Sequence, residues 1–223
     1  MEKKSAFTLI ELLVVISIIL IASSIIFIGG SGGDGAKLGS AQRIVSGIAQ
    51  GARGQAILKS AKSRLIIYSD NSANNNDDKK LRYFGIIYEE LDSNGDPTGD
   101  WFAATQGTYL PEGIYFNPNP KLYEDWSPLT NVIGIDYPLR TAQGVGTGEL
   151  YYYYEFNSNG TMATGFDNNW LVLQAGTLKP ENGGALKVDF SEPKNEGLKA
   201  ALIFRRVGTA TLVKNPSDIP NPD

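Results

Sequence analysis

The chain has 223 residues, of which 20 are lysine or arginine and 24 are aspartate or glutamate, and it contains neither cysteine nor histidine. Without cysteine, a disulfide framework and a thiolate metal site are excluded. Without histidine, the commonest general base and the commonest metal ligand are missing. Residues 36–66 carry six basic residues and no acidic one. The remainder is therefore acidic, which disfavours nucleic acid as a partner.

The chain begins with a long apolar segment. Lys3 and Lys4 precede a run from Phe7 to Ile28 in which Glu11 is the only charged residue. As a helix, this run spans roughly 33 Å, enough to cross a bilayer core of about 30 Å. A secretory signal peptide is shorter and lacks an acid in its apolar run. A plain membrane anchor leaves Glu11 unexplained, because a carboxylate at the centre of a membrane helix costs about 3 kcal/mol.

A third interpretation rests on the string Phe-Thr-Leu-Ile-Glu-Leu-Leu-Val-Val-Ile at residues 7–16. This string resembles the class III signal of type IV pilins and type II secretion pseudopilins. The resemblance implies that a prepilin peptidase cuts between Ala6 and Phe7, and that Phe7 becomes the N-methylated first residue of the mature chain. It also makes Glu11 the fifth mature residue, with a role in assembly. The family normally has glycine before the cut, and the small residue Ala6 replaces it here.

This interpretation divides the chain into five parts. Residues 1–6 form a leader peptide, and residues 7–28 form a helix for the membrane and the filament core. The glycine-rich residues 29–35 break that helix, because glycine is unfavourable in helix interiors. Residues 36–214 form an amphipathic helix and a β-rich globular domain. Residues 215–223, which contain three prolines, form a tail that we expect to fray.

Apolar residues recur at three- and four-residue spacing from Ala36 onward, which predicts an amphipathic helix whose apolar face lies on a sheet. The residues of this face are Leu38, Ala41, Val45, Ile48 and Ala52, followed after Gly54 by Leu58, Ala61 and Leu65. The basic residues belong to its other faces. Such a face is either simply solvated, or it receives the acidic domains of neighbouring subunits in a filament.

After Arg64 the pattern changes to one typical of strands. Residues 70–80 read as a polar loop, and residues 117–148, rich in proline and glycine, as a long surface excursion with little regular structure. The expected strands are 65–68, 81–91, 101–105, 114–116, 149–156, 170–175, 186–190, 198–206 and 211–214, with 81–91 paired to 101–105.

An oxygen-rich stretch separates that pair of strands. Its weak candidates for calcium ligands are Asp92, Asn94, Asp96 and Asp100. The spacing departs from the helix-loop-helix calcium site, since Pro97 stands in its glycine position and Ala103 in its glutamate position. Asn-Gly and Pro-x-Gly are also typical of hairpin turns. We therefore expect a plain turn, and no metal or other cofactor.

The predicted fold class is α+β. One long N-terminal helix, with an apolar membrane half and an amphipathic half, packs on antiparallel β-sheet in a pilin-like roll. The order of elements, together with residues 52–57, 154–160 and 206–209, resembles the minor pseudopilin H type of type II secretion and its pilus counterpart. Certain pilus members carry a basic Gly-Arg-x-Arg motif that binds DNA, and this motif is absent here.

The resemblance implies a structural, non-enzymatic subunit of a pseudopilus or pilus-like filament. Its partners would be the prepilin peptidase, other pilin or pseudopilin subunits, an inner-membrane assembly platform and membrane lipid. It would cross the bacterial inner membrane once, with its globular domain outside the cytoplasm, before entering the filament. No nucleophile elbow, phosphate loop or zinc spacing occurs in the sequence. The alternative is a membrane-anchored extracytoplasmic ligand-binding domain or enzyme.

Overall fold

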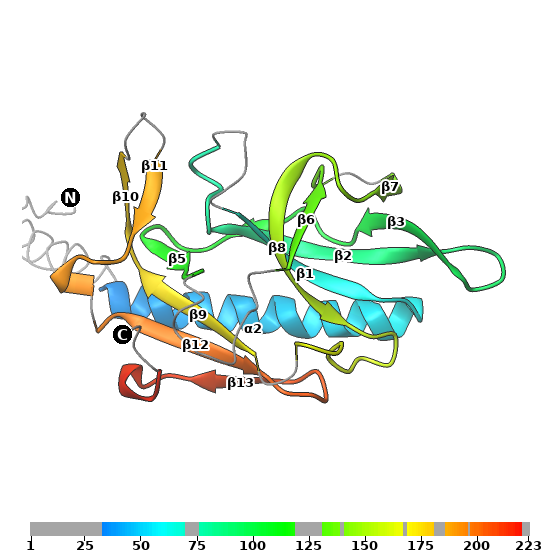
Figure 1. The fold of residues 1–223 in the computed structure, drawn as a ribbon. Coiled ribbons are helices and arrows are strands. Elements are labelled where there is room, and N and C mark those ends of the chain that lie inside the picture. Colours follow the sequence, from blue (N-terminus) through cyan, green and yellow to red (C-terminus); the bar gives the residue numbers. More distant parts are fainter. Residues whose placement is uncertain are drawn as a thin grey trace, which may run out of the picture. The chain divides into compact units, whose positions relative to one another are not determined.

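The computed structural model describes residues 33–69, 76–118, 131–138, 141–166, 169–180, 186–195 and 197–219. The chain divides into two units, Met1–Gly33 and Asp34–Asp223, and the description that follows concerns the second. Figure 1 shows α2 (Asp34–Lys59), the α-helix of the described ranges, running along two antiparallel sheets. Contacts of α2 with strands of both sheets place the helix between them.

The apolar face predicted for this helix is confirmed. Its buried residues are Leu38, Ala41, Gln42, Val45, Ala49, Ala52 and Ala56, and Ile48 is partly buried against them. The predicted continuation of this face beyond Gly54 is confirmed only in part, because Ala61 and Leu65 are buried but both lie beyond the end of the helix. The helix ends at Lys59, Ser60 adopts a left-handed φ of 51°, and Leu58 is 74% exposed. Leu65 is buried instead in the following strand.

The larger sheet has the strand order β6-β8-β1-β2-β3-β7, with β4 paired to β2, and all its pairs are antiparallel. Its strands are β1 (Ser63–Tyr68), β2 (Tyr83–Leu91), β3 (Pro97–Ala103), β4 (Thr108–Tyr109), β6 (Val132–Ile135), β7 (Gln143–Gly144) and β8 (Glu149–Phe156). The predicted pairing of residues 81–91 with 101–105 is confirmed by the β2–β3 hairpin, in which Tyr88 faces Phe102.

The smaller sheet has the order β13-β12-β9-β5. Its strands are β5 (Ile114–Phe116), β9 (Trp170–Ala175), β12 (Lys199–Phe204) and β13 (Ala210–Val213), and β10 (Thr177–Pro180) and β11 (Leu186–Asp189) form a separate hairpin. Two short 3-10 helices, η3 (Pro193–Asn195) and η4 (Pro216–Asp218), complete the described part. Beyond η4, Ile219 is buried beside Val172 and Ala201, so the tail is packed on the domain as far as this residue.

The two ends of the larger sheet are joined by the segment between β6 and β8. The Gly146 N–H donates to the Gly134 carbonyl oxygen at 2.9 Å. The side chain of Gln143, on β7, bonds to the Asp136 N–H and carbonyl, just after β6, at 3.1 and 2.7 Å. The larger sheet is therefore nearly closed on itself.

A nearly closed sheet has an inside, and the domain accordingly contains two main cores. The helix-side core lies between α2 and the two sheets and includes Ala52, Phe84, Tyr154 and Phe204. The closed-sheet core is enclosed by the larger sheet. Its members are Ile66, Tyr68, Tyr83, Ile87, Trp101, Ile133, Ile135, Tyr137 and Tyr151.

The predicted fold class, an α+β pilin-like roll built on one long helix, is wrong. Within the described ranges the helix covers only Asp34–Lys59, and the fold is mostly β-sheet with a nearly closed main sheet. The error arose at residues 117–148, where we expected little regular structure. β6 and β7 lie there and provide the closure. Because side chains alternate between the two faces of a strand, closure gives β1 and β8 a core on each side.

Candidate functional site

The residues predicted to carry processing and assembly, Ala6, Phe7 and Glu11, lie outside the described residues. The same holds for the predicted membrane helix at residues 7–28. In the ranges that the structure describes, no helix combines the length and apolar character needed to cross a membrane.

The weak calcium candidates lie in the turn between β2 and β3. One carboxylate oxygen of Asp92 accepts hydrogen bonds from the backbone N–H groups of Asn94 and Asp96, at 2.8 and 2.9 Å. The bond from Asp96, followed by that from Asn94, lowers the pKa of the Asp92 carboxyl. Gly95 has a φ of 88°, which suits glycine. The Asp92 carboxylate thus stabilises its own turn. Among the described residues, no three acidic side chains are grouped so that they could hold a metal ion.

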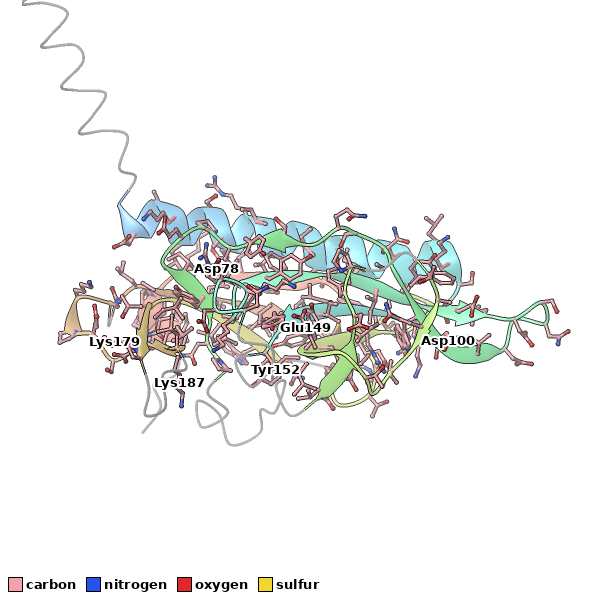
Figure 2. The ribbon with its side chains drawn as sticks, turned by 90° about the horizontal axis from the view of Figure 1, so that it is seen from above. Asp78, Asp100, Glu149, Tyr152, Lys179 and Lys187 are labelled. Carbon is pink, nitrogen blue, oxygen red and sulfur yellow. The ribbon has the colours of Figure 1, made fainter. Side chains whose placement is uncertain are left out.

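The same hairpin forms an exposed acidic projection, which we call the acidic tip and define as residues 89–100. It contains two glutamates and three aspartates and no basic residue. Residues 92–99 are exposed, and none of the tip carboxylates forms an ion pair with another described residue. Figure 1 shows this hairpin projecting past the end of the domain, and Figure 2 labels Asp100 there.

The base of the acidic tip adjoins the C-terminal end of α2. The Glu89 N–H donates to the Lys62 carbonyl at 2.9 Å. The ammonium of Lys59, the last residue of α2, lies 4.9 Å from the centre of the Tyr88 ring. These contacts fix the direction in which the hairpin leaves the domain.

A second feature lies at the opposite end of α2. A hollow of about 270 Å³, which we call the basic hollow, is lined by Gly35, Leu38, Gly39, Gln42, Arg43, Ala200, Leu212 and Lys214. Its lining is apolar apart from Gln42 and two cations, Arg43 and Lys214, which are both exposed. Neither cation forms an ion pair within the described ranges.

The walls of the basic hollow are fixed by one buried side chain. The Gln42 amide donates to the carbonyl oxygens of Ala201 on β12 and Val213 on β13, at 2.8 and 2.9 Å. A buried amide with both donor bonds made holds the first turns of α2 against the smaller sheet. The hollow is thus preformed.

A comparable hollow of about 290 Å³ lies on the β10–β11 hairpin, where Figure 2 labels Lys179 and Lys187. Its charges are paired: Lys179 contacts Asp189 at 2.6 Å and Glu192 at 3.2 Å. Hydrogen bonds from Lys194 first, and then from Lys179, lower the pKa of Glu192 to about 2. Lys179 is therefore paired within this region and is less available to a charged partner than the cations of the basic hollow.

Two polar groups close the ends of the closed-sheet core. At one end the Arg64 guanidinium lies 4.0 Å from the Trp101 ring and 4.1 Å from the Tyr153 ring, and it contacts the Glu155 carboxylate at 2.8 Å. At the other end of β8, Glu149 accepts bonds from Lys79 and from the hydroxyls of two core tyrosines. These groups neutralise one another and serve the packing of the sheet.

Sequence reasoning missed the basic hollow. Arg43 was counted in the basic run, but Lys214 and Leu212 come from β13 and its end, which lie far along the chain. No local pattern joins them to α2. The acidic character of the tip can be read from the sequence. Its position, at the end of α2 opposite the hollow, can be known only from the fold.

Comparison with known proteins informs the first part of the chain. Residues 1–27 match the family described as the prokaryotic N-terminal methylation motif. Neither the curated proteins nor the solved structures contain a match to the chain. The matched segment covers the residues on which the class III signal was predicted. The motif therefore supports a pilin-like protein that is processed by a prepilin peptidase.

Proposed function

We propose that this protein is a structural subunit of a type II secretion pseudopilus or a type IV pilus-like filament, anchored in the inner membrane and then assembled through its N-terminal helix. The observation that carries the proposal is the methylation motif at residues 1–27, followed by a compact domain that begins at Asp34. The resemblance to the H type makes a minor subunit the expectation.

The chemistry of the N-terminus gives the proposal a mechanism. Cleavage before Phe7 creates a positively charged α-amine next to an apolar run that contains one carboxylate, Glu11. An isolated charge among packed apolar helices costs several kcal/mol, so amine and carboxylate neutralise each other. When the amine of one subunit pairs with the Glu11 carboxylate of its neighbour, this ion pair fixes the axial step of assembly. Pairing within one helix would give no such register.

The test replaces Glu11. We expect Glu11→Ala to be inserted in the membrane and cleaved, but not to co-purify with the assembled filament. Glu11→Gln, which keeps the shape and loses the charge, is expected to be nearly as defective. Ala6→Gly is the matched control, because it changes the residue beside the cut and leaves the mature chain unaltered. Normal incorporation of both Glu11 variants would contradict the pairing of amine and carboxylate, and failure of the unaltered chain to co-purify with the filament would contradict the proposed function.

The alternative of an anchored ligand-binding domain or enzyme predicts a different outcome. Such a protein keeps its activity when residues 1–33 are removed, because only the domain from Asp34 onward performs it. A filament subunit loses its function on the same truncation. Complementation of a deletion strain by the truncated chain would therefore favour the alternative.

A further inference from the structure

We propose that the acidic tip of one copy docks in the basic hollow of a second copy of this chain. The contact deepens the proposed function and rests on it, since it supplies a link between globular domains in addition to helix packing. It also requires at least two neighbouring copies in one filament, which a less abundant subunit can still provide.

Charge complementarity is the first argument. The hollow presents Arg43 and Lys214, and the tip presents carboxylates that include Asp96 and Asp100. Neither set forms ion pairs with other described residues of its own copy. Opposite charges without partners attract each other across an interface and select one orientation. Asp92 is not counted, because its carboxylate is bonded to the backbone of its own turn.

The tip and the hollow also have complementary apolar surfaces. Leu38, Ala200 and Leu212 line the hollow together with the two cations. On the tip, Pro97 is exposed between Asp96 and Thr98, so its ring can cover this apolar lining while the neighbouring carboxylate reaches Arg43. A small apolar centre with a charged rim is the usual arrangement in protein interfaces.

The two surfaces cannot meet within one copy. The hollow lies at the first turns of α2, and the tip leaves the domain beside its last turn. A helix of 26 residues separates these ends by roughly 39 Å at 1.5 Å per residue. Contact between two different surfaces on successive copies is heterologous, and a heterologous contact that does not close generates an open row of subunits. This geometry fits a filament better than a closed dimer.

Other surfaces of the domain fit the tip less well. The hollow on the β10–β11 hairpin has its lysine paired to Asp189 and Glu192. Arg64 and Lys79 are paired to Glu155 and Glu149 at the ends of the closed-sheet core. Among these sites, the basic hollow alone combines unpaired cations with an apolar lining.

The absence of cysteine permits a direct test in the full-length protein in its own membrane. Two differently tagged copies are co-expressed, one with Ser93→Cys in the tip and the other with Leu212→Cys in the hollow, and a short thiol-specific cross-linker is added. We expect a product that contains both tags. The matched control pairs Ser93→Cys with Gln50→Cys, an exposed position in the middle of α2, which should give about tenfold less product if the contact is specific.

Charge reversal tests the recognition itself. Arg43→Glu in the hollow copy, or Asp96→Lys in the tip copy, is expected to reduce the cross-linked product about tenfold, and the two together are expected to restore it. Failure of the double reversal to restore the product would overturn the proposal. Equal products from Leu212→Cys and Gln50→Cys would overturn it as well.

Gly39 provides a variant in which fold and docking respond in opposite directions. A Cβ at this helical position meets no other atom within 4 Å. Gly39→Leu therefore keeps or raises the melting temperature while its side chain fills the hollow, and the cross-linked product should be lost. Gly39→Ala adds helix propensity without filling the hollow, and it should keep the product. If both variants keep the cross-linked product, docking in the hollow is contradicted.

The remaining outcomes separate the possible occupants. Cross-linking of Leu212→Cys to a different protein, or to Ser31→Cys of the same chain, would assign the hollow to another partner or to the preceding segment and would overturn the proposal. If the contact fails while incorporation still depends on Glu11, the filament function stands alone. If cross-linking persists while the unaltered chain does not co-purify with a filament, the filament function fails instead.

Discussion

The two cores on either side of the larger sheet are built from different side chains. The helix-side core meets α2 through small residues, Ala41, Ala49, Ala52 and Ala56, which allow the helix to lie close to the strands. The closed-sheet core has four tyrosines among its nine buried residues, and each of them must place a polar hydroxyl.

Each of these hydroxyls has a partner. Tyr68 and Tyr151 donate to Glu149, Tyr83 donates to the Gln106 carbonyl at 2.7 Å, and Tyr137 donates to the Thr105 carbonyl at 2.8 Å. The comparison indicates that apolar packing dominates where α2 meets the sheets, with Gln42 as a buried polar contact, whereas the closed-sheet core also depends on polar groups at its rims.

The largest effect is expected from a cavity in the helix-side core. Phe204 is fully buried, with its ring 4.7 Å from that of Tyr154. Phe204→Ala removes these contacts and leaves a cavity, so the free energy of unfolding should fall by about 3–5 kcal/mol. Denaturant unfolding of the full chain in detergent, followed by tryptophan fluorescence, measures it. A loss below about 1 kcal/mol would mean that this region can collapse to fill the space.

At the rim of the closed-sheet core, the important contact is an ion pair. Arg64→Met leaves Glu155, which is 9% exposed in its side chain, with Lys62 as its remaining ion-pair partner among the described residues. We expect a loss of about 2–4 kcal/mol, because the nearly buried carboxylate keeps only the half-exposed Lys62 as its ion-pair partner. The double variant Arg64→Met/Glu155→Leu removes both charges and should recover most of the loss. Equal losses in the single and double variants would show that stacking on the two rings, and not the charge, stabilises the rim.

The sequence predicted more of the helix-side core than of the closed-sheet core. The apolar spacing on α2 predicted the face that joins the helix-side core as far as Ala52, since this pattern is local. The sequence has four consecutive tyrosines, Tyr151 to Tyr154, which lie on both faces of β8. The closing strands β6 and β7 are only four and two residues long and lie in a proline- and glycine-rich stretch. Closure depends on contacts such as Gly146 with Gly134, which no periodicity reveals.

The candidate site divides in the same way. The class III signal is a contiguous string, and the motif match at residues 1–27 confirms the coarse prediction made from it. The basic hollow combines the start of α2 with the end of β13, so only the fold brings it together.

Replacement of two glycines by alanine, one on β2 and one on α2, should change the free energy of unfolding by smaller amounts and in opposite directions. A Cβ at Gly85 on β2 would clash with the hydroxyl oxygen of Tyr137 and with its ring. Gly85→Ala should therefore overpack the closed-sheet core and cost about 1–3 kcal/mol. At Gly47, on the outer face of α2, a Cβ meets nothing within 4 Å. Gly47→Ala should stabilise by up to about 1 kcal/mol. Thermal unfolding of the two variants decides the point, and the same sign for both would contradict the packing described for Tyr137.

The smallest expected effect is the dependence on alkaline pH. Burial first, and then the neighbouring Tyr137, raise the pKa of Tyr83 from 10.0 to about 12. The unfolded chain loses this proton near pH 10 while the folded chain keeps it, so the contribution is complete below pH 10 and is lost as pH rises toward 12. Between these values the free energy of unfolding falls as pH rises. In Tyr83→Phe this slope should become shallower, and an unchanged slope would mean that Tyr83 ionises freely in the folded domain.

The processed N-terminus tests the central claim most directly. Intact-mass and peptide mass spectrometry of the protein isolated from its native membrane should find a chain that begins at Phe7 with an added methyl group on its amine. The processed chain should be missing in Ala6→Leu, where a large side chain stands beside the cut. A mature chain that begins at Ser24 or later, or a native chain that keeps Met1 throughout, would contradict a class III signal and the pilin-like function drawn from it.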